Sequence, residues 1–141
     1  MATTKKATAA YVAKMATVRE NREKWLTALE SGEYKQTMSH LRAKKGNSYG
    51  YCCLGVLCNL NKDKENSWDE TLFISKNLNY NPSDIFSDKE HDCDTMPPDS
   101  FLDKVKVNTQ LADDLATMND SGKTFKEIAA FLRKKWRMPK A

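Results

Sequence analysis

The chain has 141 residues and a mass of 16.1 kDa, with 40% hydrophobic residues, 30% charged residues and a formal net charge of +4. These values are typical of one globular domain that builds its own core, so we predict a single domain over residues 1–141. No apolar run approaches the roughly 20 residues that cross a bilayer, and residues 1–10 lack the apolar core of a secretory signal. The sequence therefore predicts a cytoplasmic protein without membrane contact, whose four cysteines stay reduced.

Charge is distributed unevenly along the chain. Residues 1–55 hold 10 basic and 4 acidic groups, residues 56–122 hold 6 and 14, and residues 123–141 hold 7 and 1. Two interpretations remain open: the blocks neutralise one another across the surface, or the two basic ends form an anion-binding face. Neither predicts an extended DNA groove.

The first element is a long amphipathic helix over residues 8–30, preceded by a disordered segment at residues 1–7. Its apolar stripe predicts a core-facing helix, with a dimerisation seam as the alternative. Gly32 provides the expected helix stop. The stripe consists of Tyr11, Val12, Met15, Val18, Trp25, Leu26 and Leu29.

The central stretch, residues 49–58, puts three cysteines and two tyrosines into one apolar run. It predicts a buried central element built around Cys-Cys-Leu-Gly-Val, for which we favour a short helix over a strand. Before it, residues 33–41 fit a strand or a short helix, and residues 42–48 read as a basic turn. After it, residues 61–97 form a loop-rich insertion in which we expect one or two short strands.

Three helices are predicted in the C-terminal third. A short one follows Pro97 and Pro98 and runs to about residue 105. The next two, over residues 108–118 and 124–136, form an antiparallel hairpin; Thr124 and Glu127 have capping-box spacing. The last helix is expected to bury Phe125, Ile128, Phe131, Leu132 and Trp136, and residues 138–141 form a frayed tail. The predicted fold class is therefore α+β, mostly helical, with little strand content.

Three pieces of the sequence resemble a family of small proteins encoded by tailed bacteriophages. They are residues 22–32, residues 36–60 with the Cys-Cys-Leu-Gly-Val run, and residues 115–129 with Asn119-Asp120 and the Phe-Lys-Glu-Ile-Ala helix. They cover about half of the chain, while residues 61–94 match least. The resemblance implies a phage origin and an accessory role in the host cytoplasm, and it implies no particular reaction.

Catalytic and metal sites are weakly indicated. Cys53, Cys58, His91 and Cys93 could bind zinc, but their spacing does not match known zinc motifs, and we favour simple buried thiols. A nucleophilic cysteine would need His40 or His91 as its base. Gly122-Lys123-Thr124 resembles the end of a phosphate-binding loop, yet Thr117 stands where that loop requires glycine. We therefore predict no catalytic residues, no cofactor and no metal, and favour a non-enzymatic protein.

A binding function remains. Basic, aromatic and amide side chains suit a nucleotide-type ligand, because rings stack on bases and cations hold phosphates. We predict an inhibitor of host defence that sequesters a nucleotide-type signal or a host protein, and that could form a homo-oligomer. The alternatives are a nucleic-acid-binding accessory protein and a small enzyme acting on a nucleotide or a host protein. The predicted ligand-binding residues are Gln36, Arg42, Lys44, Lys45, Tyr49, Tyr51, Asn119, Asp120 and Lys123.

Overall fold

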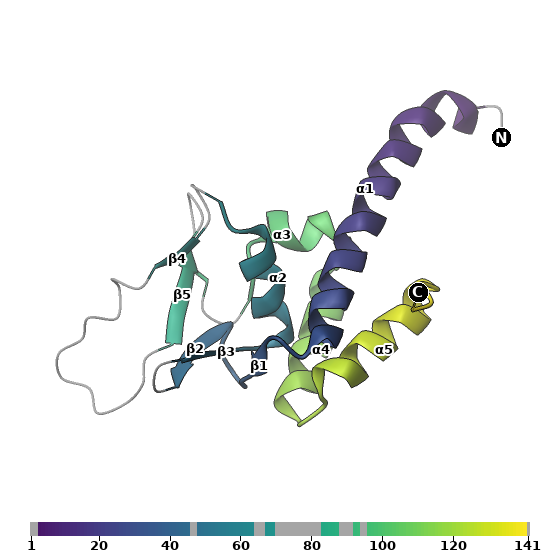
Figure 1. Cartoon of the computed structure of the whole chain (residues 1–141). Coiled ribbons are helices and arrows are strands. Elements are labelled where there is room, and N and C mark those ends of the chain that lie inside the picture. Colours follow the sequence, from purple (N-terminus) through teal and green to yellow (C-terminus); the bar gives the residue numbers. More distant parts are fainter. Residues whose placement is uncertain are drawn as a thin grey trace.

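The computed structural model describes residues 3–45, 48–63, 67–69, 83–87, 92–93 and 96–140. They form a small α+β domain that is mostly helical, which confirms the predicted fold class. The strands gather at one end of the molecule, and α1, α4 and α5 lie at the other (Figure 1). Among the helices in these ranges, none is long and apolar enough to cross a membrane.

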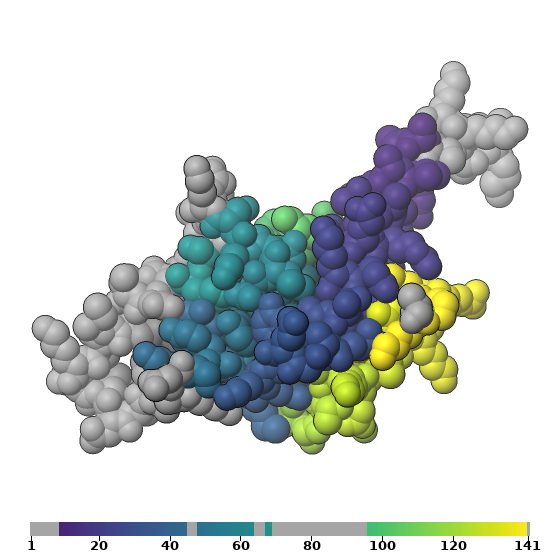
Figure 2. Space-filling model, in the orientation of Figure 1, coloured from purple at the N-terminus to yellow at the C-terminus, as the bar shows by residue number. Residues whose placement is uncertain are grey.

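Helix α1 (Thr3–Ser31) begins before its predicted start near residue 8, and only its C-terminal half packs on the body. Among the side chains that the structure describes, Val18 is the first buried one along α1, and Trp25 and Leu29 continue the buried stripe. The prediction that Tyr11 and Val12 belong to the core is wrong, because their side chains are 57% and 56% exposed. The helix extends past the elements that cover its stripe, so its first half projects as an arm (Figures 1 and 2).

The sheet is built around the hairpin of β2 (Arg42–Lys45) and β3 (Ser48–Tyr51), which pair antiparallel. β1 (Lys35–Gln36) pairs parallel with β3 on the other side. The predicted basic turn over residues 42–48 is therefore wrong for Arg42–Lys45, which form a strand. Backbone pairing with β3 organises this polar segment, although it has no apolar alternation of its own.

The predicted insertion over residues 61–97 lies largely outside the described residues. Its described parts include three short strands, rather than the expected one or two. β5 (Ser83–Ser87) pairs antiparallel with β2, with β4 (Ser67–Asp69) and with β6 (Asp92–Cys93). This pairing joins the insertion to the edge of the β2–β3 hairpin.

Helix α2 (Cys53–Asn61) is the buried central element, as predicted, and its residues from Cys53 to Cys58 are all buried. Cys52 is its N-cap: the Sγ atom accepts a hydrogen bond from the Gly55 N–H at 3.3 Å. The Trp25 indole N–H donates to the Cys53 carbonyl at 2.9 Å and ties α1 to the start of α2. At Gly55, a Cβ atom would collide with the backbone carbonyl of Leu41, so only glycine fits this approach.

The C-terminal helices follow the predicted boundaries closely: α3 is Asp99–Lys104, α4 is Thr109–Asp120 and α5 is Phe125–Trp136. The predicted capping box is confirmed, since Thr124 and Glu127 exchange both hydrogen bonds at 3.1 Å. Phe131 was predicted to be buried, and this is wrong: it is 40% exposed because it lies on the outer side of α5. Trp136 is half-buried, with the Arg22 guanidinium 4.0 Å from its ring centroid.

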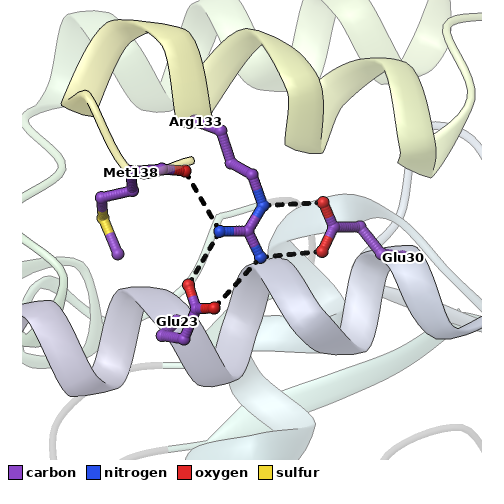
Figure 3. Close-up of polar contacts among 4 residues, drawn as sticks. All are labelled: Glu23, Glu30, Arg133 and Met138. Atoms are coloured by element: carbon purple, nitrogen blue, oxygen red, sulfur yellow. Dashed lines mark hydrogen bonds and ion pairs between the residues drawn. The ribbon is translucent and has the colours of Figure 1, made fainter. Parts of the chain in front are cut away.

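Arg133 is the buried cation that fastens α5 to α1 (Figure 3). Its guanidinium donates to both oxygens of Glu30 at 2.7 and 2.8 Å, and to both oxygens of Glu23 at 2.8 and 3.3 Å. It also donates to the Met138 carbonyl at 3.2 Å. Met138 is itself buried, so the chain remains packed beyond the end of α5. The hydrogen bonds from Arg133 lower the pKa of Glu30.

Candidate functional site: an aromatic face on the sheet

The strand register puts four predicted ligand-binding residues on one face of the sheet. Arg42 pairs with Tyr51, and Lys44 pairs with Tyr49. Directly paired residues point to the same face, as do residues two apart in a strand, so these four side chains are cofacial. Gln36, the partner of Tyr51 in β1, falls on this face as well. The side chain of Lys45 lies outside the described residues.

Two rings on this face, those of Tyr49 and Trp68, contact the Arg42 guanidinium. The Arg42 Cζ atom lies 3.9 Å from the Tyr49 ring centroid and 4.6 Å from that of Trp68. Tyr51 makes edge contacts with Trp68 at 6.0 Å and with Tyr34 at 5.1 Å between centroids. Arg42 is only 5% exposed. The four rings of this face are half-buried; they belong to Tyr34, Tyr49, Tyr51 and Trp68. We call this surface the aromatic face; it comprises Tyr34, Arg42, Lys44, Tyr49, Tyr51 and Trp68.

Asn59 of α2 holds two of these rings in place. Its amide N–H donates to the Tyr34 hydroxyl at 3.0 Å, and its amide oxygen accepts from the Trp68 indole N–H at 3.1 Å. The Lys62 ammonium also donates to that oxygen, at 3.2 Å. The rings are therefore preorganised by hydrogen bonds, with Lys44 exposed beside them.

Asn119, another predicted ligand-binding residue, is fully buried at the end of α4, where it connects three elements. Its oxygen accepts from the Gln36 amide at 2.9 Å and from the Cys53 N–H at 3.2 Å. Its Nδ2 donates to the Thr37 carbonyl at 2.7 Å. Gln36 in turn donates to the Lys123 carbonyl at 2.7 Å. The polar groups of Gln36 and Asn119 thus bind one another where β1 meets the end of α4.

Asp120 and Lys123 lie at the turn between α4 and α5. The Asp120 carboxylate accepts from the Ser39 N–H at 2.8 Å, where Ser39 has a left-handed φ of 69°. The Lys123 ammonium is 4.0 Å from Glu127, whose carboxylate caps the start of α5. Gly122-Lys123-Thr124, which resembles the end of a phosphate-binding loop, therefore leads into a helix start that Thr124 and Glu127 already cap.

A small cavity of about 150 Å³ lies beside the Cys52 cap. Ser39, His40, Cys52 and Asp120 contribute its polar lining, with Met96 and Ala116. Burial raises the pKa of the Cys52 thiol to about 11, despite the hydrogen bond from Gly55 that favours the thiolate. The thiol is therefore protonated at neutral pH and serves as a capping acceptor, which disfavours its action as a nucleophile.

The zinc hypothesis concerns residues that are only partly described. Cys53 and Cys58 are completely buried thiols within α2, and burial raises the pKa of Cys53 well above its ordinary value. His91 and the Cys93 side chain lie outside the described residues. Within the described ranges, no group of three or more His, Cys, Asp or Glu side chains is arranged to hold a metal ion.

Sequence reasoning missed Trp68, Tyr34 and Asn59 as parts of the face. Trp68 stands in a polar segment with no periodicity to place it, and Asn59 is a polar position within an apolar helix. Tyr34 carried a usable signal, since it lies two residues before Gln36 and so shares its side of an extended strand.

These features define a small α+β domain with a cationic, aromatic sheet face. The chain belongs to the family of a domain of unknown function (DUF8296), whose model matches residues 18–136. No curated protein and no solved structure matches it.

Proposed function

We propose that this is a phage-encoded accessory protein that binds a nucleotide-type ligand on the aromatic face and sequesters it in the host cytoplasm, thereby inhibiting host defence. One observation carries the proposal: Arg42, Lys44, Tyr49 and Tyr51 share one face of the sheet. The resemblance to tailed-phage proteins supports the accessory role.

The chemistry of the face suits a ligand that combines an aromatic ring with negative charge. A base stacked on a tyrosine or tryptophan ring contributes about 1–3 kcal/mol of binding free energy. Lys44 is exposed and can contact a phosphate, while the buried Arg42 guanidinium adds positive potential beneath the rings.

The cavity beside Cys52 is small for a nucleotide. The cavity beside Cys52 holds about 150 Å³. Pockets that enclose a ligand of nucleotide size typically measure about 300–1,000 Å³. A nucleotide is therefore too large for that cavity, and we place the proposed ligand on the surface instead.

Calorimetric titration with a panel of mono-, di- and cyclic nucleotides tests the proposal. We expect at least one member to bind, and Tyr49→Ala and Lys44→Ala each to weaken its affinity about tenfold, since each removes a contact of about 1–2 kcal/mol. Lys126→Ala, an exposed lysine on α5, is the matched control and should bind like the wild type.

Two other outcomes separate the alternatives. Binding only to long oligonucleotides, with affinity that falls steeply with salt, would indicate the nucleic-acid-binding function. Retention of a host protein without any nucleotide would assign the face to a protein partner. Either result would overturn nucleotide sequestration.

A further inference from the structure

We propose that the projecting arm of α1 binds a second copy of this chain, in the acidic groove beside the C-terminal half of α1. The arm is residues 3–17. The groove is lined by residues from α1, the start of the following loop and the end of α2, and it holds about 650 Å³.

The composition of the arm is typical of a helical segment that a partner covers. Tyr11 and Val12 are large apolar side chains that are more than half exposed. The first turn of α1 has no acidic residue to complement the helix dipole. A projecting helix of this length is only marginally stable in water, so contact with a partner would stabilise it.

The arm also lies outside the family domain. The family model begins at residue 18, and Val18 is the first buried residue of α1 among the side chains that the structure describes. The buried part of α1 therefore begins where the family model begins, and the exposed arm before it is the part that we assign to an intermolecular role.

The charges of arm and groove are complementary. The arm carries three basic residues, Lys5, Lys6 and Lys14, and no acidic one. The groove presents the carboxylates of Glu20 and Glu33 and the ammonium of Lys24. A third carboxylate in its lining, that of Glu23, is paired with Arg133. Opposite charges of this kind steer association and fix its register.

The groove also offers apolar surface for the arm. Leu60 is 41% exposed at the end of α2, and Ala28 lies in the same wall. These groups can cover Val12 or Tyr11 of the incoming arm. Two arms packed on each other would instead bring like charges together, so the groove of the second copy is the favoured site.

Complementary charge reversal tests this inference. The arm-reversed variant carries Lys5→Glu, Lys6→Glu and Lys14→Glu, and the groove-reversed variant carries Glu20→Lys and Glu33→Lys. Glu23 stays unchanged because it binds Arg133. Asp113→Lys with Asp114→Lys, two exposed carboxylates on α4, is the control for charge reversal elsewhere.

Native mass spectrometry and sedimentation velocity at low ionic strength measure the mass of the assembly that each variant forms. We expect the wild type and the α4 control to form dimers or larger assemblies, and each reversed variant to be monomeric by itself. Mixing the two reversed variants should restore assembly, because each arm then meets a groove of opposite charge. Deleting residues 1–17 should give a monomer that still unfolds in one cooperative transition.

Three results would overturn the inference. The first is a monomeric wild type at all concentrations tested. The second is assembly that survives deletion of residues 1–17. The third is a mixture of the reversed variants that stays monomeric while the wild type assembles.

Discussion

At the scale of single residues, Gly55 sets how closely α2 approaches the strand region. A Cβ at this position would lie 2.7 Å from the Leu41 carbonyl carbon and closer still to its oxygen. We expect Gly55→Ala to destabilise the protein by about 3 kcal/mol or more, because backbone cannot yield as a side chain does. Gly32→Ala, in open space with a φ of 79°, should cost only about 1 kcal/mol. Urea denaturation of both variants measures the difference, and equal losses would contradict this explanation.

Asn119 is the second residue on which the domain depends. Asn119→Ala removes the acceptor of the Cys53 N–H and the donor to the Thr37 carbonyl, and both lie in buried surroundings. We expect a loss of about 2–4 kcal/mol in the free energy of unfolding. Asn108→Ala, which removes the side-chain cap at the exposed start of α4, should cost about 1 kcal/mol. If Asn119→Ala kept wild-type stability in urea, the network would have no structural role.

Cys52 gives a pH-dependent prediction at the same scale. Because burial raises the pKa of its thiol to about 11, alkylation by iodoacetamide should be slow at pH 8 and accelerate about tenfold per pH unit toward pH 10. Peptide mapping identifies the modified residue. A rate that levels off near neutral pH would mean an activated thiolate and would restore the enzyme hypothesis.

At the scale of elements, Arg133 joins α5 to α1 and makes their packing sensitive to acid. In the folded protein its hydrogen bonds lower the pKa of Glu30 below the ordinary 4.5, so folding favours the ionised carboxylate. This stabilisation is present above pH 4.5 and is lost as the pH falls through the lowered pKa. The wild type should therefore lose stability steeply below about pH 4.5.

Replacing Arg133 tests this joint. Arg133→Met leaves Glu30 without its cation. We expect the free energy of unfolding to fall by about 3 kcal/mol at pH 7, and to depend less on pH below about pH 4.5 than it does in the wild type. Lys134→Met, an exposed neighbour on α5, should change neither quantity. Thermal denaturation of both variants between pH 3 and pH 7 measures the effect. If the wild type and Arg133→Met lost the same stability between pH 7 and pH 3, Arg133 would not be the cause of the acid sensitivity.

At the scale of the whole molecule, local signals predicted the helices and failed for the sheet. Thr124 and Glu127 predict the start of α5, because their capping contacts lie within one helical turn. The strand Arg42–Lys45 has no such signal, because it exists through pairing with β3. Periodicity within α1 could not reveal that Tyr11 lies beyond the elements that bury the rest of its stripe. The fold class could thus be predicted from local patterns. The exposure of the arm could not, because it depends on which elements pack against α1.

The same limit applies to the candidate site. The sequence predicted Arg42, Lys44, Tyr49 and Tyr51 as binding residues, and the register makes them cofacial. It could not reveal that Gln36 and Asn119, which are 83 positions apart, bind each other. Nor could it place Trp68 against Arg42, since that contact depends on how the insertion returns to the sheet.

The measurement that tests the central claim most directly is calorimetric titration of the wild type and Tyr49→Ala with the nucleotide panel. Nucleotide binding to the wild type, weakened about tenfold in Tyr49→Ala while that variant still unfolds cooperatively in urea, is the predicted result. Absence of binding by every nucleotide tested, or equal affinities for the two proteins, would contradict a nucleotide site on the aromatic face.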